Sequence, residues 1–167
     1  IDKRIVLKGT KDVILDGLHK TSIIIIRSNG VTVQGLTIRN SGYSDLRELA
    51  GIRLEDVSRC KIEGNYLYDN YFGIYLSNSQ HCKVLNNRVE GLAKTETSSG
   101  NGIHLWKSEY NLLIGNHVSG HRDGIYFEFV KHSAVISNLS ELNLRYGLHF
   151  MFSDDDSYRF NTFRNNG

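Results

Sequence analysis

Short runs of alternating apolar and polar residues recur along the chain, each beginning at a glycine. The first and third positions after that glycine are apolar, and the position between them is polar or aromatic. Alternation with a period of two, in short runs bounded by Gly and Asn, is typical of β-strands. The pattern therefore predicts an all-β protein. The five apolar pairs are Ile52 and Leu54, Ile74 and Leu76, Ile103 and Leu105, Ile125 and Phe127, and Leu148 and Phe150.

These strands belong to a repeat of about 22 residues. The glycines that open the runs are separated by 22, 29, 22 and 23 positions, and they are Gly51, Gly73, Gly102, Gly124 and Gly147. A second marker keeps the same spacing, namely Asn65, Asn87, Asn116, Asn138 and Asn161. Asn tolerates the left-handed backbone of a bend, and its amide can hydrogen-bond along a stack. The Asn column therefore predicts a structural ladder.

A repeat of this length, with several short strands and no helix, predicts one turn of a parallel β-helix. Successive coils then stack at about 4.8 Å. The leucine-rich repeat has an overlapping period, but its Leu-rich signature and its helical or 3₁₀ half are missing here. We expect one domain over residues 1–167, with irregular coils over residues 1–50 and regular coils over residues 51–167, as part of a longer chain.

Charge and composition narrow the function classes only slightly. The formal net charge is +2, and no run of like charges suggests a nucleic-acid partner. No apolar stretch is long enough to span a bilayer, so direct membrane insertion is not expected. Two insertions, residues 41–50 and 91–101, fall at the same junction of the coil. They predict two loops along one edge, where repeat proteins often bind partners.

The residues between the core positions predict two outward columns on one sheet. At the C-terminal end, Leu148, Phe150 and Phe152 are expected to fill the core, while His149 and Met151 point outward. Exposed aromatic, His and Met side chains in neighbouring coils form a candidate binding surface. The first column contains Arg53, Tyr75, His104, Tyr126 and His149, and the second contains Glu55, Ser77, Trp106, Glu128 and Met151.

Three interpretations of this surface remain open. Imidazole and thioether suit copper, so His149 and Met151 are candidate ligands. His104 lies two coils away, roughly 9 to 10 Å on the stacking distance, which favours a transfer site shared with a partner over a complete site. In the second interpretation the face is covered by the rest of the protein. In the third it binds sugars, with rings stacked on Trp106, Tyr75 and Tyr126 and hydroxyls bonded by Arg53, Glu55 and Glu128.

Acidic residues offer a catalytic alternative. Residues 153–156 are Ser-Asp-Asp-Asp, and Asp123 lies in the neighbouring coil. Paired carboxylates could serve glycoside hydrolysis or hold calcium for polysaccharide elimination. Consecutive Asp residues after a strand are also common turn formers, and no Lys or Arg stands out as a base. The alternative function is therefore that of a polysaccharide-binding or polysaccharide-cleaving β-helix.

The two cysteines occupy one inward column in adjacent coils, because Cys60 and Cys82 are 22 positions apart. Their expected Cα separation fits the disulfide range, but directly stacked strands orient their side chains alike. We therefore expect a pair of buried thiols. A zinc site is not expected, because the column contains no further Cys and no His.

Two strings in the C-terminal half resemble the NosD family: SGHRDGIYFEFVKHS from Ser119 and NLRYGLHFMFSDDDSYRFNTFRNNG from Asn143. The resemblance implies a right-handed parallel β-helix in the periplasm that works with an ATP-binding-cassette ATPase and a membrane permease. It also implies that copper arrives from a lipoprotein chaperone and is bound only transiently. The implied role is non-enzymatic, in maturation of the copper–sulfur centre of nitrous oxide reductase.

The resemblance also selects the candidate docking surface. It comprises the residues inside the matching strings, together with two outward residues of the preceding coil, and no catalytic residue is expected. The candidate copper ligands are His149 and Met151. The candidate docking residues are His104, Trp106, His121, Arg122, Asp123, Tyr126, Glu128, Arg145, Tyr146 and His149.

Overall fold

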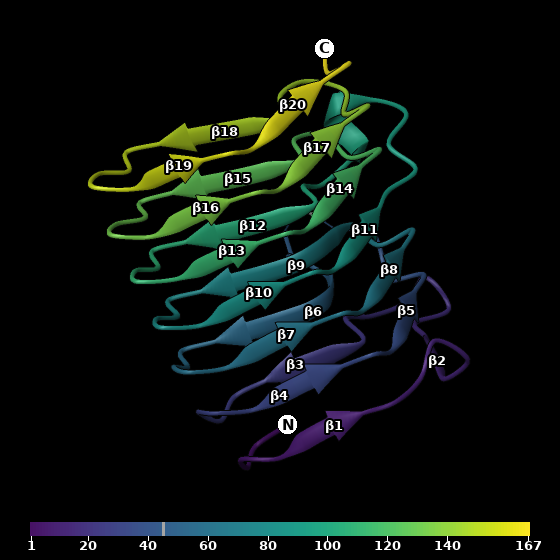
Figure 1. The fold of residues 1–167 in the computed structure, drawn as a ribbon. Helices are drawn as coiled ribbons and strands as arrows, with labels where there is room; N and C mark the ends of the chain where they lie inside the picture. Colours follow the sequence, from purple (N-terminus) through teal and green to yellow (C-terminus); the bar gives the residue numbers. More distant parts are fainter. Residues whose placement is uncertain (45) are drawn as a thin grey trace.

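The computed structural model describes residues 1–44 and 46–167. It is a right-handed parallel β-helix in which each coil contributes one strand to each of three sheets, as predicted. The coils stack directly on one another, with the two termini at opposite ends of the stack (Figure 1). All strand pairs that form the three sheets are parallel, because each strand pairs with its equivalent in the next coil.

Sheets A and B consist of three-residue strands. Sheet A contains β1 (Val6–Lys8), β4 (Thr32–Gln34), β7 (Lys61–Glu63), β10 (Lys83–Leu85), β13 (Leu112–Ile114), β16 (Ala134–Ile136) and β19 (Ser157–Arg159). Sheet B contains β2 (Ile14–Asp16), β5 (Thr37–Arg39), β8 (Tyr66–Tyr68), β11 (Arg88–Glu90), β14 (His117–Ser119), β17 (Leu139–Glu141) and β20 (Thr162–Arg164).

Sheet C has the longer strands, and it carries the outward columns predicted above. It contains β3 (Ile24–Ile26), β6 (Ala50–Glu55), β9 (Phe72–Ser77), β12 (Ile103–Trp106), β15 (Ile125–Glu128) and β18 (Leu148–Met151). The register pairs His104 with Tyr126 and Tyr126 with His149, as the repeat alignment required. His104 and His149 are therefore two coils apart.

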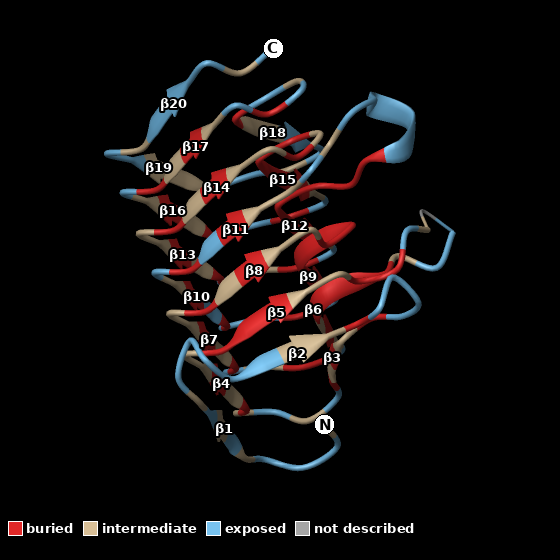
Figure 2. Ribbon diagram, turned by 90° about the vertical axis from the view of Figure 1, so that its right-hand side faces the viewer, coloured by how far each residue is buried: buried red, intermediate tan, exposed pale blue. Residues whose placement is uncertain are grey.

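The core runs along the axis of the stack. It is filled by one apolar side chain from the middle of most short strands and by two from each sheet C strand except β18. Figure 2 shows the buried residues along the inner faces of the strands. Ile62, Leu67, Ile74 and Leu76 are examples from consecutive strands, and each is fully buried. Burying apolar surface in every coil is what stabilises a stack whose coils contact only their neighbours.

The Asn column forms the predicted ladder inside the bend between sheets A and B. Asn87 donates from its backbone N and its Nδ2 to Asn116 Oδ1, both at 3.0 Å. Asn116 makes the same two bonds to Asn138 Oδ1, both at 2.9 Å. Each side chain also bonds a backbone carbonyl of the coil below, as Asn116 does with Val84 O at 2.9 Å. The ladder therefore satisfies buried backbone groups at every bend.

The prediction that Phe152 fills the core is wrong, whereas Phe150 faces inward as predicted. Phe152 adopts a left-handed turn conformation with φ 50°, so the strand's alternation ends before it, and its ring stacks outside on Phe129 with centroids 5.0 Å apart. Its exposure is 66%. Phe150 lies in the inward column above Phe127, but in the last coil described, where no further coil covers it, and it is 55% exposed.

The two insertions emerge from the same edge of the stack, as predicted. They connect β5 to β6 and β11 to β12, and the second contains the 3₁₀ helix η1 (Glu96–Ser98). Both loops project beside sheet C in Figure 2. Asp45, in the first insertion, lies outside the described residues.

Candidate functional site

Three columns of side chains, not two, form the outer face of sheet C. The third column consists of the residue immediately before the glycine of each repeat. Its members are Ala50, Phe72, Asn101, Asp123 and Tyr146. The glycines face the core: a Cβ on Gly73 or Gly102 would approach the side chains of Val89 or Val118 to 2.3 or 2.2 Å. Because the glycine and the residue after it both face inward, the residue before the glycine faces outward. We call these three columns the outer face of sheet C.

Three aromatic rings of the central column are buried, which corrects the prediction that they are exposed. Tyr75 is 1% exposed, His104 is 8% exposed and Tyr126 is 7% exposed. Each ring packs against the next at centroid distances of 4.7 to 4.8 Å, from Tyr75 through His104 and Tyr126 to His149. The two tyrosine faces expected to stack on sugars are therefore covered by protein. Trp106 is only partly buried, and Lys107 Nζ lies 4.4 Å from its ring centroid.

Buried polar atoms without partners cluster in the middle of the outer face of sheet C. Asn101 Oδ1, His104 Nε2 and Arg122 Nε have no hydrogen-bond partner within the described part of the chain. Burial lowers the pKa of His104 to about 3, so its imidazole is neutral. Asn101 Nδ2 lies 3.4 Å from His104 Nδ1. Unsatisfied buried polar groups are rare in folded proteins, and an ordered water molecule commonly satisfies them.

Asp123 is the electrostatic centre of this face. Its carboxylate is fully buried and accepts two bonds from Arg145, from Nε to Oδ1 at 3.1 Å and from Nη2 to Oδ2 at 2.6 Å. His149 Nδ1 lies 3.5 Å and Arg122 Nε 3.6 Å from Oδ2. The bonds to Asp123 raise the pKa of Arg145. Glu96 Oε2, in η1 of the second insertion, lies 3.6 Å from Arg145 Nη1, so this loop also contacts the ion-pair cluster around Asp123.

His149 and Met151 lie together on β18, at the rim of the buried cluster. The His149 side chain is 24% exposed and Met151 is 37% exposed. An imidazole that donates Nδ1–H to a carboxylate carries its lone pair on Nε2, the nitrogen then available to a metal. Tyr126 donates its hydroxyl to Met151 Sδ at 3.2 Å. The pair thus offers an imidazole and a thioether, two donor types that suit copper.

The described residues contain no cluster of three or more of the common metal-binding side chains, His, Cys, Asp and Glu, that could hold an ion. His149 and Met151 supply only two ligands.

His121 lies away from the outer face of sheet C, contrary to its place in the predicted docking set. Its side chain is 2% exposed and helps to line a cavity of about 410 Å³ between the two insertion loops, together with Tyr43, Tyr71 and Ser98. Its Nε2 has no partner among the described residues. Burial lowers its pKa to about 4. Of the remaining predicted residues, Glu128 is partly buried at the end of β15, and Tyr146 is 49% exposed beside His149, with ring centroids 5.0 Å apart.

Acidification should destabilise the protein through His121. The imidazole is neutral in the folded state, with a pKa of about 4, and is protonated below about pH 6.5 in the unfolded state. The unfolded state therefore binds more protons, and the free energy of unfolding falls as pH drops from about 6.5 to about 4, by at most about 1.4 kcal/mol per pH unit for this group. Urea unfolding at about pH 7.5 and about pH 5 measures the loss.

His121→Gln should reduce this acid sensitivity, since the amide does not titrate. His81→Gln, at an exposed position, serves as the matched control. An equal loss of stability on acidification in His121→Gln and the unmodified protein would contradict the prediction.

The acidic run of residues 153–156 and Asp123 lie at opposite ends of the sheet C strands. Asp123 precedes β15, whereas the run follows β18 at the other end of sheet C. Asp155 has the left-handed φ of a turn, 56°, and Asp156 Oδ1 accepts the backbone N–H of Ser133 at 2.7 Å. The structure thus gives these residues turn and backbone contacts and does not bring them to Asp123.

Cys60 and Cys82 are buried free thiols in adjacent coils, as predicted. Cys60 Sγ lies 3.4 Å from Ser28 O, and Cys82 Sγ lies 3.4 Å from Gln80 O. Interaction between the two neighbouring thiols lowers the pKa of Cys60 to about 7 and raises that of Cys82. Sequence reasoning found the pair but assigned it no function.

Two family models match the chain. A right-handed β-helix region matches residues 50–167, and the family described as "Periplasmic copper-binding protein (NosD)" matches residues 3–95. The chain is also 38% identical, over 127 residues and 74% of its length, to a "Probable ABC transporter binding protein NosD" of Pseudomonas aeruginosa. It belongs to the NosD family. A NosD protein of Stutzerimonas stutzeri is 29% identical over 127 residues, and the chain spans 29% of the length of each of these two relatives.

Solved structures similar to this NosD-family chain share its fold. A periplasmic alginate epimerase, AlgG, superimposes with a TM-score of 0.69 at 24% identity, over 92% of this chain and 34% of its own. A glycosyl hydrolase homologue from Parabacteroides merdae gives 0.67 at 10% identity, over 96% of this chain and 81% of its own. At these identities the likeness concerns the β-helix alone. In the described residues no helix is long and apolar enough to cross a membrane.

Proposed function

We propose that this chain is part of a periplasmic, non-enzymatic accessory protein that helps to deliver copper to nitrous oxide reductase as its copper–sulfur centre matures. The observation that carries the proposal is the match to the NosD family, described as periplasmic and copper-binding, together with 38% identity to a relative named as an ABC transporter binding protein. The partners we propose are an ABC permease with its ATPase, a copper chaperone lipoprotein, and the reductase itself.

The outer face of sheet C is the surface we propose for docking and transfer. Around its buried centre, the side chains of Trp106, Tyr146, His149 and Met151 are partly exposed, which suits contact with another protein. At its rim, His149 and Met151 are the donors we propose for transient contact with copper, which is cargo and not a resident cofactor. Two uncharged ligands, an imidazole and a thioether, suit transient binding, and a partner can supply the rest.

The buried rings of this face favour docking over sugar binding. A sugar platform needs aromatic faces open to solvent, and Tyr75 and Tyr126 are 1% and 7% exposed. A polysaccharide function would have to use Trp106 and the loops instead.

Deleting the gene for the full-length protein tests the proposal. Nitrous oxide reductase purified from the deletion strain should lack the copper–sulfur centre, because its copper would not be delivered. Reintroducing the gene should restore the copper content per reductase subunit, measured by elemental analysis. A reductase with its full complement of copper in the deletion strain would contradict the proposed function.

A further inference from the structure

Cys60 and Cys82 lie outside the outer face of sheet C and play no part in the transfer surface proposed above. Each side chain is 1% exposed and faces the interior of the coil, just before β7 and β10. Lys61 pairs directly with Lys83, and Lys83 N donates to Cys60 O at 2.9 Å. The two cysteines therefore occupy equivalent positions in consecutive coils.

Stacking fixes the spacing of the two thiols. Equivalent positions on neighbouring strands lie about 4.8 Å apart, and their side chains point the same way. A disulfide needs sulfur atoms about 2.05 Å apart and converging Cβ atoms, which parallel side chains do not provide. Two opposed metal–thiolate bonds of about 2.3 Å each span about 4.6 Å. The spacing therefore suits one metal ion held between the two sulfurs.

The donor set selects a soft metal ion. Thiolates favour monovalent copper, whereas zinc takes four ligands. In the coil above, the same column contains Asn111, whose Oδ1 accepts the backbone N–H of Cys82 at 2.9 Å. In the coil below it contains Val31, whose carbonyl accepts the N–H of Lys61 at 2.8 Å. Neither neighbour adds a third soft ligand, so a two-coordinate ion is the arrangement that the column permits.

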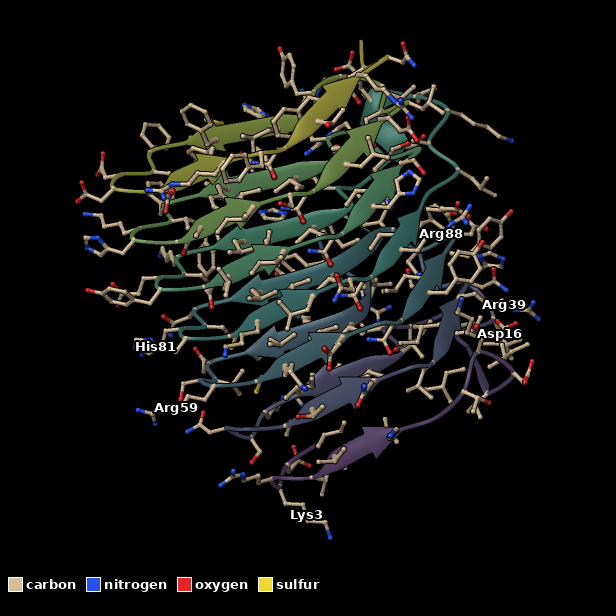
Figure 3. All side chains as sticks on the ribbon, in the orientation of Figure 1. Lys3, Asp16, Arg39, Arg59, His81 and Arg88 are labelled. Atoms are coloured by element: carbon tan, nitrogen blue, oxygen red, sulfur yellow. The ribbon has the colours of Figure 1, made fainter. Side chains whose placement is uncertain are left out.

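Cationic side chains surround the approach to Cys60. The thiol helps to line a cavity of about 530 Å³, whose wall also contains Arg4, Arg59, Lys61 and Lys83. Arg59 and His81, the residues just before the two cysteines, project from the edge of the stack where the chain enters β7 and β10 (Figure 3). A monovalent copper ion between two thiolates has a net charge of −1, and nearby cations stabilise both the thiolates and that charge. Of the two cysteines, Cys60 borders this cavity, so an ion would reach the pair from the Cys60 side.

We propose that Cys60 and Cys82 hold one Cu(I) ion as a two-coordinate bis-thiolate site, which stores the copper that the outer face of sheet C passes on. Binding forms two copper–sulfur bonds, breaks two S–H bonds and releases two protons, and copper stays monovalent throughout. The choice of metal rests on the proposed function, and the copper-binding family model covers residues 3–95, which include both cysteines but neither His149 nor Met151.

Anaerobic titration of the full-length protein with Cu(I) against a competing chelator tests this site. Cys60→Val/Cys82→Val should lose one tightly bound equivalent of copper, whereas Asp154→Ala, at an exposed position, should lose none. Val already occupies the same column at Val31, so the variant should fold, and circular dichroism melting checks this. X-ray absorption of the copper-loaded protein should show two sulfur neighbours, and this signature should vanish in the valine variant.

Unchanged copper stoichiometry in Cys60→Val/Cys82→Val, or an intact mass showing a disulfide between these cysteines in the purified protein, would overturn the inference. Loss of the tight equivalent in His149→Ala/Met151→Ala alone would also overturn it while leaving the proposed function standing. Conversely, a cysteine-bound equivalent in a protein whose deletion leaves the reductase fully loaded would support this site and refute the proposed function.

Discussion

Asp123→Ala should lower the free energy of unfolding by about 3 to 5 kcal/mol, the usual cost of removing one partner from a buried ion pair. The carboxylate is fully buried and is the shared acceptor for Arg145, with Arg122 and His149 within 3.6 Å. Without it, Arg122 and Arg145 lose the carboxylate that lies beside both of them. Chemical denaturation followed by circular dichroism measures the change.

Two variants bracket this result. Asp123→Asn keeps an oxygen acceptor of the same shape and loses the charge, so it should fall between Asp123→Ala and the unmodified protein. Asp154→Ala removes an exposed carboxylate whose nearest cation, Lys131 Nζ, is 3.8 Å away, and should change stability by less than about 1 kcal/mol. Equal effects of the Asp123 and Asp154 substitutions would contradict the assigned role of Asp123.

Asn116→Ala should destabilise the protein by about 2 to 5 kcal/mol. The side chain accepts two hydrogen bonds from Asn87 at 3.0 Å and donates to Val84 O at 2.9 Å and to Asn138 Oδ1 at 2.9 Å. Its removal leaves a buried N–H and a buried carbonyl unpaired, each at a cost of about 1 to 3 kcal/mol. The midpoint of urea unfolding should move to lower urea concentration.

Asn29→Ala is the matched control, because Asn29 Oδ1 accepts the N–H of Ser58 at 2.7 Å in an exposed setting. Water replaces that bond when it is lost, so we expect a change below about 1 kcal/mol. If Asn116→Ala were as stable as Asn29→Ala, the ladder would not contribute what its buried geometry indicates.

The fold could be predicted from the sequence because a β-helix repeats one coil. Spacing of Gly and Asn fixed which residues stack, and the register of Tyr126 with His104 and His149 followed directly. The Asn ladder and the common edge of the two loops could also be predicted, since each depends on one position of the repeat. These features need no knowledge of how side chains pack.

Burial on the outer face of sheet C could not be predicted in this way. The alternation of residues along a strand tells which side of the sheet a side chain lies on, but not whether neighbouring side chains cover it. Rings at the same position in successive coils pack on one another, so Tyr75 and His104 are buried although they point outward. The third column, which contains Asp123, could not be predicted because Gly124 and the residue after it both face inward and so interrupt the alternation. Phe152 was misassigned because alternation ends at its left-handed turn.

The copper content of nitrous oxide reductase in a deletion strain carrying His149→Ala/Met151→Ala tests most directly whether the outer face of sheet C carries the function. The full-length variant should be made in normal amounts, because both side chains lie at the rim of the buried cluster. We predict a reductase depleted of the copper–sulfur centre, with full loading restored by the unmodified gene and by the Asp154→Ala control. Full loading with the His149→Ala/Met151→Ala variant would contradict the account.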